Sequence, residues 1–227
     1  MNSIRWPHGP LQAAIVDLDG TMVDTLGDFA AALNRMLAEL ALPPVARAAI
    51  ETMVGKGSEH LIASVLRHVG ADGGLYEKAW VAYQAHYLAI NGQHSDLYPG
   101  VLEGLRALQA RGLVLACLTN KPTAFALPLL RAKGLDGFFS QVYGGDAFAR
   151  KKPDPLPLLE TCKALGTAPG RTLMVGDSSN DARAARAAGC PVLLVTYGYN
   201  HGEPVRAVDA DGFVDSLADI GRFLGLD

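Results

Sequence analysis

The sequence predicts an α/β fold, a parallel sheet covered by helices with a helical segment inserted near its start. Two observations carry this prediction. In the second half of the chain, short apolar runs alternate with stretches of helical length, which is typical of parallel sheets with helical crossovers. In the first half, one apolar run ends near Asp17 and the next begins only at Leu113. A strand–helix–strand crossover needs about thirty residues, so the excess indicates an insertion.

Each predicted strand is a short, nearly continuous apolar run. Such runs suit a parallel sheet because both of its faces are buried. The predicted strands are Ala13–Asp17, Leu113–Thr119, Gln141–Tyr143, Thr172–Val175 and Pro191–Val195. The predicted helices of the same unit are Val101–Ala110, Pro122–Lys133, Leu156–Leu165 and Asp181–Ala188.

The predicted insertion has a helical period and little strand signal. Its apolar and aromatic residues recur at spacings of three and four, as in Phe29, Leu33, Met36, Leu37 and Leu40, and again in Trp80, Tyr83 and Tyr87. Pro99-Gly100 marks the return to the main body. We therefore expect a core of residues 1–26 and 97–227 and a helical cap of residues 27–96.

Composition excludes several classes of protein. The 227 residues are 49% hydrophobic, with a net charge of −3 and no block of Lys or Arg, so neither nucleic acid nor an anionic membrane is expected as a partner. No apolar run is long enough to span a bilayer, and Met1–Pro10 lacks the apolar stretch of a signal peptide. Cys117, Cys162 and Cys190 lie among apolar neighbours, as reduced cysteines do. We expect a cytoplasmic enzyme.

Polar residues follow the predicted strands at the points where the strands end. They stand in Asp17–Thr21, Thr119–Lys121 and Gly176–Asp181, and a further loop contributes Lys151–Pro155. The carboxyl ends of parallel strands meet at one edge of a sheet, where open α/β sheets bind ligands. These four segments are therefore expected to form one site.

The residue types in these segments indicate phosphate chemistry beside a metal ion. Asp17, Asp19 and Asp177, with no cluster of His or Cys, suit a hard cation such as Mg²⁺. A lysine with threonine and asparagine donors suits an anion. A phosphate ester beside Mg²⁺ satisfies both sets, and a carboxylate can act as a nucleophile toward phosphorus.

These motifs resemble those of the haloacid dehalogenase superfamily of phosphatases. Asp17–Asp24 resembles the first signature, DxDGTxxD, whose last acid, Asp24, receives no catalytic role. Thr119, Lys152-Pro153 and Gly176–Asp181 resemble the second, third and fourth motifs, in the same order. The resemblance implies a Rossmann-like core with an inserted helical cap.

The resemblance also implies a role for each matching residue. Asp17 is expected to be the nucleophile that forms an aspartyl-phosphate, and Asp19 the general acid and base. Thr119 and Asn120 are expected to hold the phosphoryl oxygens, and Lys152 to neutralise the nucleophile and the phosphate.

The same resemblance implies the ligands of Mg²⁺. These are the carboxylates of Asp17 and Asp177 and the backbone carbonyl of Asp19, with Asp181 in or near the next layer of residues. The retained Asp19 argues against the dehalogenases of the superfamily, in which this acid is replaced.

Within the superfamily the chain looks closest to bacterial phosphoglycolate phosphatases. The similarity lies in Val54–Gly57, Thr119–Thr123, Gly144–Asp146 with Lys151–Pro153, and Thr196–Asn200. It implies hydrolysis of 2-phosphoglycolate to glycolate and phosphate. The loop Gly55, Lys56, Gly57 is expected to receive the substrate carboxylate through backbone N–H groups and the lysine ammonium; the alternative is a solvated loop.

Two other readings stay open at this point. One is a related phosphatase, pyrophosphatase or phosphomutase that acts on a sugar phosphate or another small phosphorylated metabolite. The other is a phosphate-binding regulatory module on an inactive scaffold, which the intact Asp17, Asp19, Lys152 and Asp177 disfavour. The sequence makes no prediction of oligomeric state.

Overall fold

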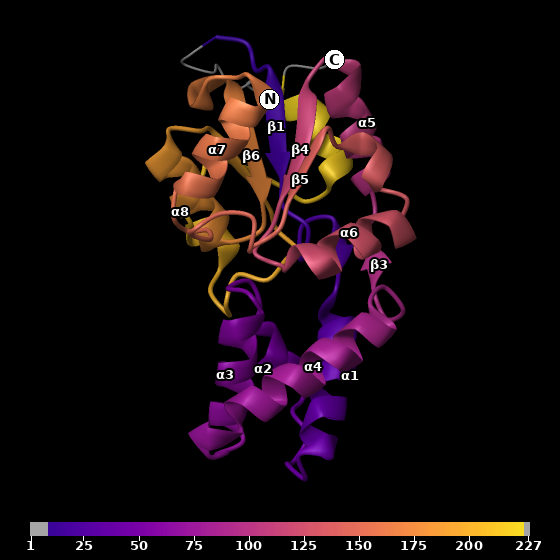
Figure 1. Cartoon of the computed structure of the whole chain (residues 1–227). Coiled ribbons are helices and arrows are strands. Elements are labelled where there is room, and N and C mark those ends of the chain that lie inside the picture. Colours follow the sequence, from indigo (N-terminus) through magenta and orange to yellow (C-terminus); the bar gives the residue numbers. More distant parts are fainter. Residues whose placement is uncertain (1–8, 225–227) are drawn as a thin grey trace.

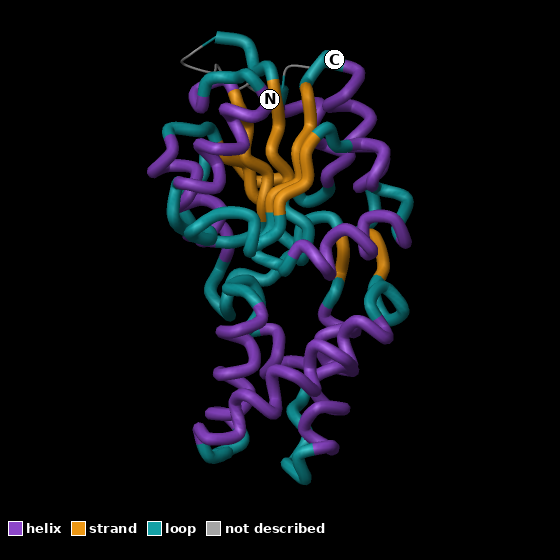
Figure 2. The backbone as a smooth tube through the Cα atoms, viewed as in Figure 1, coloured by secondary structure: helices purple, strands orange, loops and turns teal. Residues whose placement is uncertain are grey.

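A six-stranded parallel sheet forms the centre of the computed structural model, which describes residues 9–224 (Figures 1 and 2). Within these residues the strand order is β5-β4-β1-β6-β7-β8, and every neighbouring pair is parallel. The strands are β1 (Ala13–Val16), β4 (Val114–Leu118), β5 (Gln141–Tyr143), β6 (Thr172–Gly176), β7 (Val192–Val195) and β8 (Gly212–Val214). The predicted α/β fold class is confirmed.

Helices cover both faces of this sheet, which explains its continuous apolar strands. In β1, Ala14 and Val16 join an apolar cluster with α5 and α6, whereas Ile15 joins one with α7 and α8. The core helices are α5 (Val101–Ala110), α6 (Thr123–Ala132), α7 (Leu156–Leu165), α8 (Ser179–Ala188) and α9 (Ile220–Phe223). Short 3₁₀ turns lie at η2 (Asp136–Phe138), η3 (Pro169–Arg171), η4 (Val205–Ala207) and η5 (Leu217–Asp219).

A second group of helices lies beyond the carboxyl ends of the strands, at the bottom of Figure 1. It contains α1 (Leu26–Glu39), α2 (Arg47–Glu51), α3 (Ser58–His68), η1 (Gly73–Leu75) and α4 (Tyr76–Ile90). Its apolar side chains form their own cluster, to which Phe125 and Tyr199 of the core also belong. We call residues 27–96 the cap and propose that they form a unit of their own.

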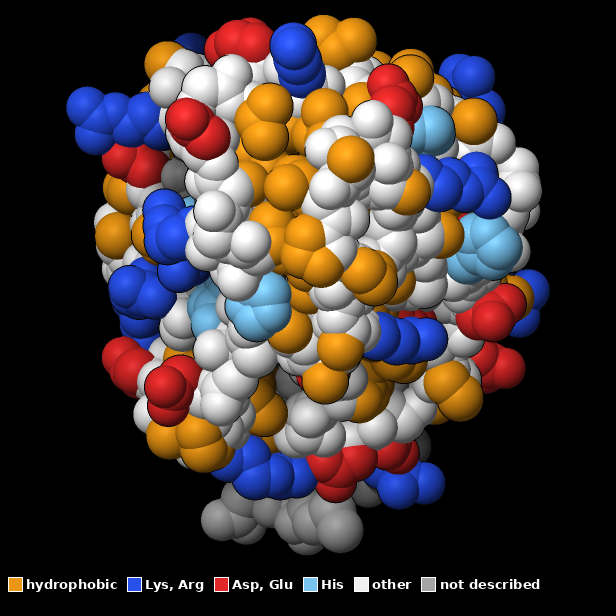
Figure 3. Space-filling view, turned by 90° about the horizontal axis from the view of Figure 1, so that it is seen from below, with side chains coloured by type: hydrophobic (Ala, Val, Ile, Leu, Met, Phe, Trp, Pro, Cys, Tyr) orange, Lys and Arg blue, Asp and Glu red, His pale blue; other side chains and the backbone are white. Residues whose placement is uncertain are grey.

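The three aromatic residues at helical spacing in α4 differ in how deeply they are buried. Tyr83 and Tyr87 are fully buried, and Trp80 is partly buried against the same cluster. Val81 and Leu88 of α4 are exposed. Figure 3, a view of the molecule from below, shows apolar side chains gathered between charged ones.

Three short strands were not predicted. β8 has three residues and begins with Gly212, so it gives a weak strand signal. β2 (Val23–Asp24) and β3 (Asp96–Leu97) are two residues each and pair antiparallel where the chain enters and leaves the cap. The N-terminal segment used to argue against a signal peptide lies, up to residue 8, outside the described residues. Among the helices of residues 9–224, none is both long and apolar enough to cross a membrane.

The buried carboxylate of Asp28 fastens α1 to the segment that follows α4. Its two oxygens accept hydrogen bonds from the backbone N–H groups of Gly92 and His94, each at 2.8 Å. The carboxylate is fully buried. Its loss would leave both N–H groups without this acceptor, at a cost in free energy of folding.

We therefore expect Asp28→Ala to lower the free energy of unfolding by about 2–4 kcal/mol and the Tm by about 5–15 °C. Asp72→Ala is the matched control, since Asp72 is exposed and accepts one backbone hydrogen bond, from Gly74. Thermal unfolding followed by circular dichroism measures both variants. Equal losses of Tm would contradict the assignment.

Candidate active site

The strand order brings the predicted site residues together. The chain runs outward from β1 to β4 and β5 and then returns to β6 on the other side of β1, so the order reverses at β1, where α/β sheets bind ligands. Val16 is level with Cys117 of β4 and Val175 of β6. Asp17, one residue further on, therefore stands at the centre of the sheet edge.

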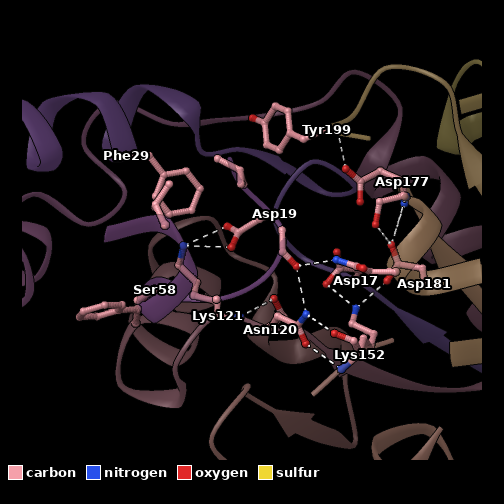
Figure 4. A pocket seen from close by; sticks show the side chains of 18 residues that line it. Asp17, Asp19, Phe29, Ser58, Asn120, Lys121, Lys152, Asp177, Asp181 and Tyr199 are labelled. Carbon is pink, nitrogen blue, oxygen red and sulfur yellow. Dashed lines mark hydrogen bonds and ion pairs between the residues drawn. The ribbon is translucent and has the colours of Figure 1, made fainter. Parts of the chain in front are cut away.

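A cavity of about 30 Å³ lies between this edge and the cap. Figure 4 shows the side chains that line it. Nine of the ten residues predicted for the site are among them: Asp17, Asp19, Gly55, Gly57, Thr119, Asn120, Lys152, Asp177 and Asp181. The tenth, Lys56, is exposed and does not line the cavity.

Three buried carboxylates form a cluster suited to a cation. Asp17, Asp177 and Asp181 each offer an oxygen, and these oxygens lie within 4.8 Å of one another. Burial, opposed by Lys152 and reinforced by Asp181, raises the pKa of Asp17 from 3.8 to about 7. Burial and the charges of Asp181 and Asp17 raise the pKa of Asp177 well above its usual range. A divalent cation would relieve this repulsion, so the donor set fits a hard metal ion.

Asp181 differs from the other two because both of its oxygens are already engaged. Oδ1 accepts a hydrogen bond from Lys152 Nζ at 2.7 Å. Oδ2 accepts from the backbone N–H of Asp177 at 3.3 Å, and from the N–H and hydroxyl of Ser178 at 3.2 and 2.9 Å. The Ser178 contacts are part of the capping box that starts α8. This arrangement agrees with the prediction that Asp181 lies in or near the next layer of residues around the cation, which stays a prediction.

Lys152 supplies a buried positive charge beside the expected nucleophile. Its Nζ is 2.9 Å from Asp17 Oδ1 and donates to the Leu118 carbonyl at 2.8 Å. Burial acts against the charged ammonium, but Asp17 and Asp181 outweigh it and raise the pKa of Lys152. The lysine is therefore held in its charged form.

Asn120 joins the loop that carries Lys152 to the cap. Its side-chain amide donates to the carbonyls of Lys152 at 2.8 Å and Gly55 at 3.0 Å, and it accepts from the Lys152 N–H at 3.0 Å. The amide is thus engaged in positioning Lys152, and a contact between Asn120 and a phosphoryl oxygen stays a prediction. Thr119 is buried beside it at the cavity wall.

The cap loop docks on the core through a backbone carbonyl. Gly55 O accepts hydrogen bonds from Asn120 and Asn180, each at 3.0 Å. Gly55 and Gly57 have φ of 103° and 89°, values that favour glycine. This loop thus presents a hydrogen-bond acceptor, the Gly55 carbonyl, to the core. The sequence predicted instead that backbone N–H groups of the loop and the Lys56 ammonium would bind the substrate carboxylate.

Lys121 and Tyr199 also line the cavity, and no role was predicted for either side chain. The Lys121 ammonium binds both oxygens of Asp19, at 3.0 and 3.2 Å. Tyr199 donates its backbone N–H to Asp177 Oδ2 at 2.6 Å, while its hydroxyl donates to Asp24 and accepts from the Leu26 N–H. Tyr199 therefore connects the carboxylate cluster to the entrance of the cap. A signal for Lys121 was its place directly after Thr119 and Asn120.

Comparison with known proteins agrees with this geometry. Residues 14–195, most of the chain, match the family of haloacid dehalogenase-like hydrolases. The chain belongs to that family. The phosphoglycolate phosphatase of Thiobacillus denitrificans is 45% identical over 213 residues, covering 92% of this chain and 94% of the relative. The enzyme class, a phosphoric monoester hydrolase, is thereby confirmed.

Solved structures of the haloacid dehalogenase-like hydrolases have the same fold. A predicted phosphoglycolate phosphatase from Haemophilus somnus superposes with a TM-score of 0.90 at 35% identity, covering 93% of this chain and 97% of that one. CbbY from Rhodobacter sphaeroides, solved in complex with phosphate, gives 0.79 at 26% identity, covering 93% and 96%.

The raised pKa values of the clustered carboxylates should make the stability of this hydrolase depend on pH. A raised pKa means that the folded state keeps a proton that the unfolded chain releases. Because the pKa of Asp17 rises from 3.8 to about 7 on folding, this stabilisation of the metal-free protein is fully present below pH 4. It is lost as the pH rises toward 7. We expect Mg²⁺ to raise the Tm more at pH 8 than at pH 5, because protons then compete less for the carboxylates.

Asp177→Asn removes one of these charges and should raise the Tm of the metal-free protein at pH 8 by about 2–8 °C while abolishing the shift caused by Mg²⁺. Asp136→Asn, at an exposed acid, is the control. Differential scanning fluorimetry in EDTA and in Mg²⁺ measures both. A lower Tm for Asp177→Asn with an intact Mg²⁺ shift would contradict the assignment of the cluster.

Proposed function

We propose that this hydrolase converts 2-phosphoglycolate to glycolate and phosphate, with Mg²⁺ as its cofactor and Asp17 as its nucleophile. The observation that carries the chemistry is the buried Asp17 carboxylate, set between the Lys152 ammonium and the Asp177 carboxylate. The substrate is supported by relatives named phosphoglycolate phosphatase, six of which are 38–45% identical to the chain and cover 92% or more of it.

In the first step, an oxygen of Asp17 attacks phosphorus and the bond between phosphorus and the ester oxygen breaks. Asp19 gives its proton to that oxygen, and glycolate leaves. In the second step, Asp19 accepts a proton from water while the water oxygen attacks the phosphorus of the aspartyl-phosphate. Phosphate leaves and the Asp17 carboxylate is restored.

Charge compensation makes an attack by one anion on another feasible. The Lys152 ammonium, already at 2.9 Å from Asp17, offsets the negative charge of the phosphoryl oxygens that come beside it. Mg²⁺ would be held by the carboxylates of Asp17 and Asp177 and by the backbone carbonyl of Asp19. Asp181 would lie in or near the next layer of residues around the ion. When bound, the ion would supply positive charge that offsets the repulsion between the nucleophile and the phosphate.

The cap side of the cavity favours a small ester. The side chains of Phe29, Leu61 and Phe125 bound the cavity there, and its free space of about 30 Å³ is smaller than either ester. The cap therefore has to move to admit substrate, and phosphoglycolate, which adds only a methylene and a carboxylate to the phosphate, demands less movement than a hexose phosphate. A sugar-phosphate phosphatase or phosphomutase is therefore the less favoured alternative.

A substrate panel tests the choice of ester. We expect kcat/KM for 2-phosphoglycolate to exceed that for glucose 6-phosphate and pyrophosphate at least about 100-fold, since binding energy depends on fit to the small cavity. EDTA should abolish the activity and Mg²⁺ should restore it. Phosphate release measures every combination. Equal rates with the hexose phosphate would contradict the proposed substrate.

A second test addresses the nucleophile. We expect Asp17→Asn to lower kcat by at least about 1000-fold, because the amide is a poor nucleophile, and to abolish acid-stable labelling by ³²P-labelled substrate. Asp136→Asn again serves as the control, since it makes the same change at an exposed acid. Undiminished turnover by Asp17→Asn would exclude the covalent mechanism.

A further inference from the structure

Lys121 carries a buried charge that the proposed reaction does not use. It follows Asn120 just beyond β4, and its side chain is 2% exposed and lines the cavity. Burial of an ammonium is costly unless the group is paired. The groups around this ammonium therefore indicate which kind of ligand it can bind.

The partners of this ammonium come from both the core and the cap. Asp19 of the core accepts with both oxygens, at 3.0 and 3.2 Å. The hydroxyl of Tyr87 on α4 accepts at 2.6 Å. The rings of Phe29 on α1 and Tyr87 lie 4.5 and 4.7 Å from Nζ, within the range of cation–π contacts. Figure 4 shows Lys121 and Lys152 on opposite sides of Asp19.

Other buried or half-buried lysines give at least one N–H to a backbone carbonyl. Lys152 donates to Leu118 in addition to its two carboxylate partners, and Lys133 donates to Gly92 and Ser95. The contacts described for the Lys121 ammonium are with side chains, and two of its bonds go to one carboxylate. A single N–H is enough to hold Asp19, so another N–H can pass to an anion that enters the cavity.

The cavity thus has two ends of different chemistry. At one end, Lys152 and the three clustered carboxylates form the site proposed for phosphate and Mg²⁺. At the other end lies Lys121, with the apolar side chains of Phe29 and Phe125 beside it in the cavity wall. In such surroundings an ammonium attracts a carboxylate more strongly than in water. A small anion with a phosphate and a carboxylate matches both ends.

We propose that Lys121 determines specificity by binding the carboxylate of the substrate. This inference rests on the proposed function and deepens it. In phosphoglycolate one methylene separates the ester oxygen, on which Asp19 acts, from the carboxylate. The carboxylate therefore comes next to the residue that already holds Asp19. The lysines of the other segments are less suited, because Lys56 is exposed and Lys151 is paired with Glu59 at 2.7 Å.

The test compares 2-phosphoglycolate with its carboxamide, which has nearly the same shape without the second charge. The quantity measured is the ratio of the two kcat/KM values. Wild type should favour the acid, and Lys121→Met should lower the ratio about 10- to 100-fold, as expected for one hydrogen bond to a charged group. Lys121→Arg keeps the positive charge and should retain more of the ratio than Lys121→Met.

A second variant serves if Lys121→Met fails to fold, as judged by circular dichroism and Tm. Tyr87→Phe keeps the ring and removes the hydroxyl that holds the ammonium, and it should lower the ratio about 2- to 10-fold. Lys163→Met is the matched control, since Lys163 is exposed on α7 and pairs only with Glu160 among its described contacts. It should keep the wild-type ratio.

Each result decides between separate claims. A ratio within twofold of wild type in Lys121→Met, with both rates lowered together, would show that the lysine acts only on Asp19 and would overturn the inference. A lowered ratio in Lys56→Met but not in Lys121→Met would assign the carboxylate to the cap loop and overturn it as well. A wild-type enzyme without preference for the acid would instead remove the proposed function itself.

Discussion

The pairing of buried charges at the sheet edge is the constraint on which the site depends. Four carboxylates, those of Asp17, Asp19, Asp177 and Asp181, lie at this edge and are nearly or wholly removed from water. Two ammonium groups partly balance them, and the positions of these two cations divide the acids by function. Lys152 is shared by Asp17 and Asp181, and Lys121 holds Asp19. The remaining negative charge is what makes the cluster a place for a divalent cation.

The same constraint ties the core to the cap. Lys121 can be buried because Phe29 and Tyr87 of the cap shield it from water. Asn120 fixes the backbone of Lys152 and the carbonyl of Gly55 with one amide. The contacts of Lys121 with Phe29 and Tyr87, and of Asn120 with Gly55, thus depend on the cap lying against the core. Exclusion of water and assembly of the site are expected to occur together.

The sequence predicted the parts of the site whose positions follow from the strands. Asp17, Thr119 and Asp177 follow β1, β4 and β6, and strand ends in one parallel sheet must meet at one edge. The sequence did not reveal the cap partners of Lys121, because Phe29 and Tyr87 lie on helices whose orientation no motif encodes. It also could not show that Gly55 offers its carbonyl, since that depends on Asn120 in a loop and Asn180 in the first turn of α8.

The carbonyl contact of Gly55 has a consequence for how this enzyme could change. A backbone oxygen looks the same whatever side chain follows it, so the contact imposes no requirement on the chemistry of position 56. Positions 55 and 57 are confined, because φ is 103° and 89° there and an added Cβ would lie 3.0 Å from the His201 ring or 3.1 Å from Glu59 and Lys151. New side chains can therefore be tried at the exposed position 56 without loss of this contact. The loop is a place where selectivity can drift while the catalytic machinery stays intact.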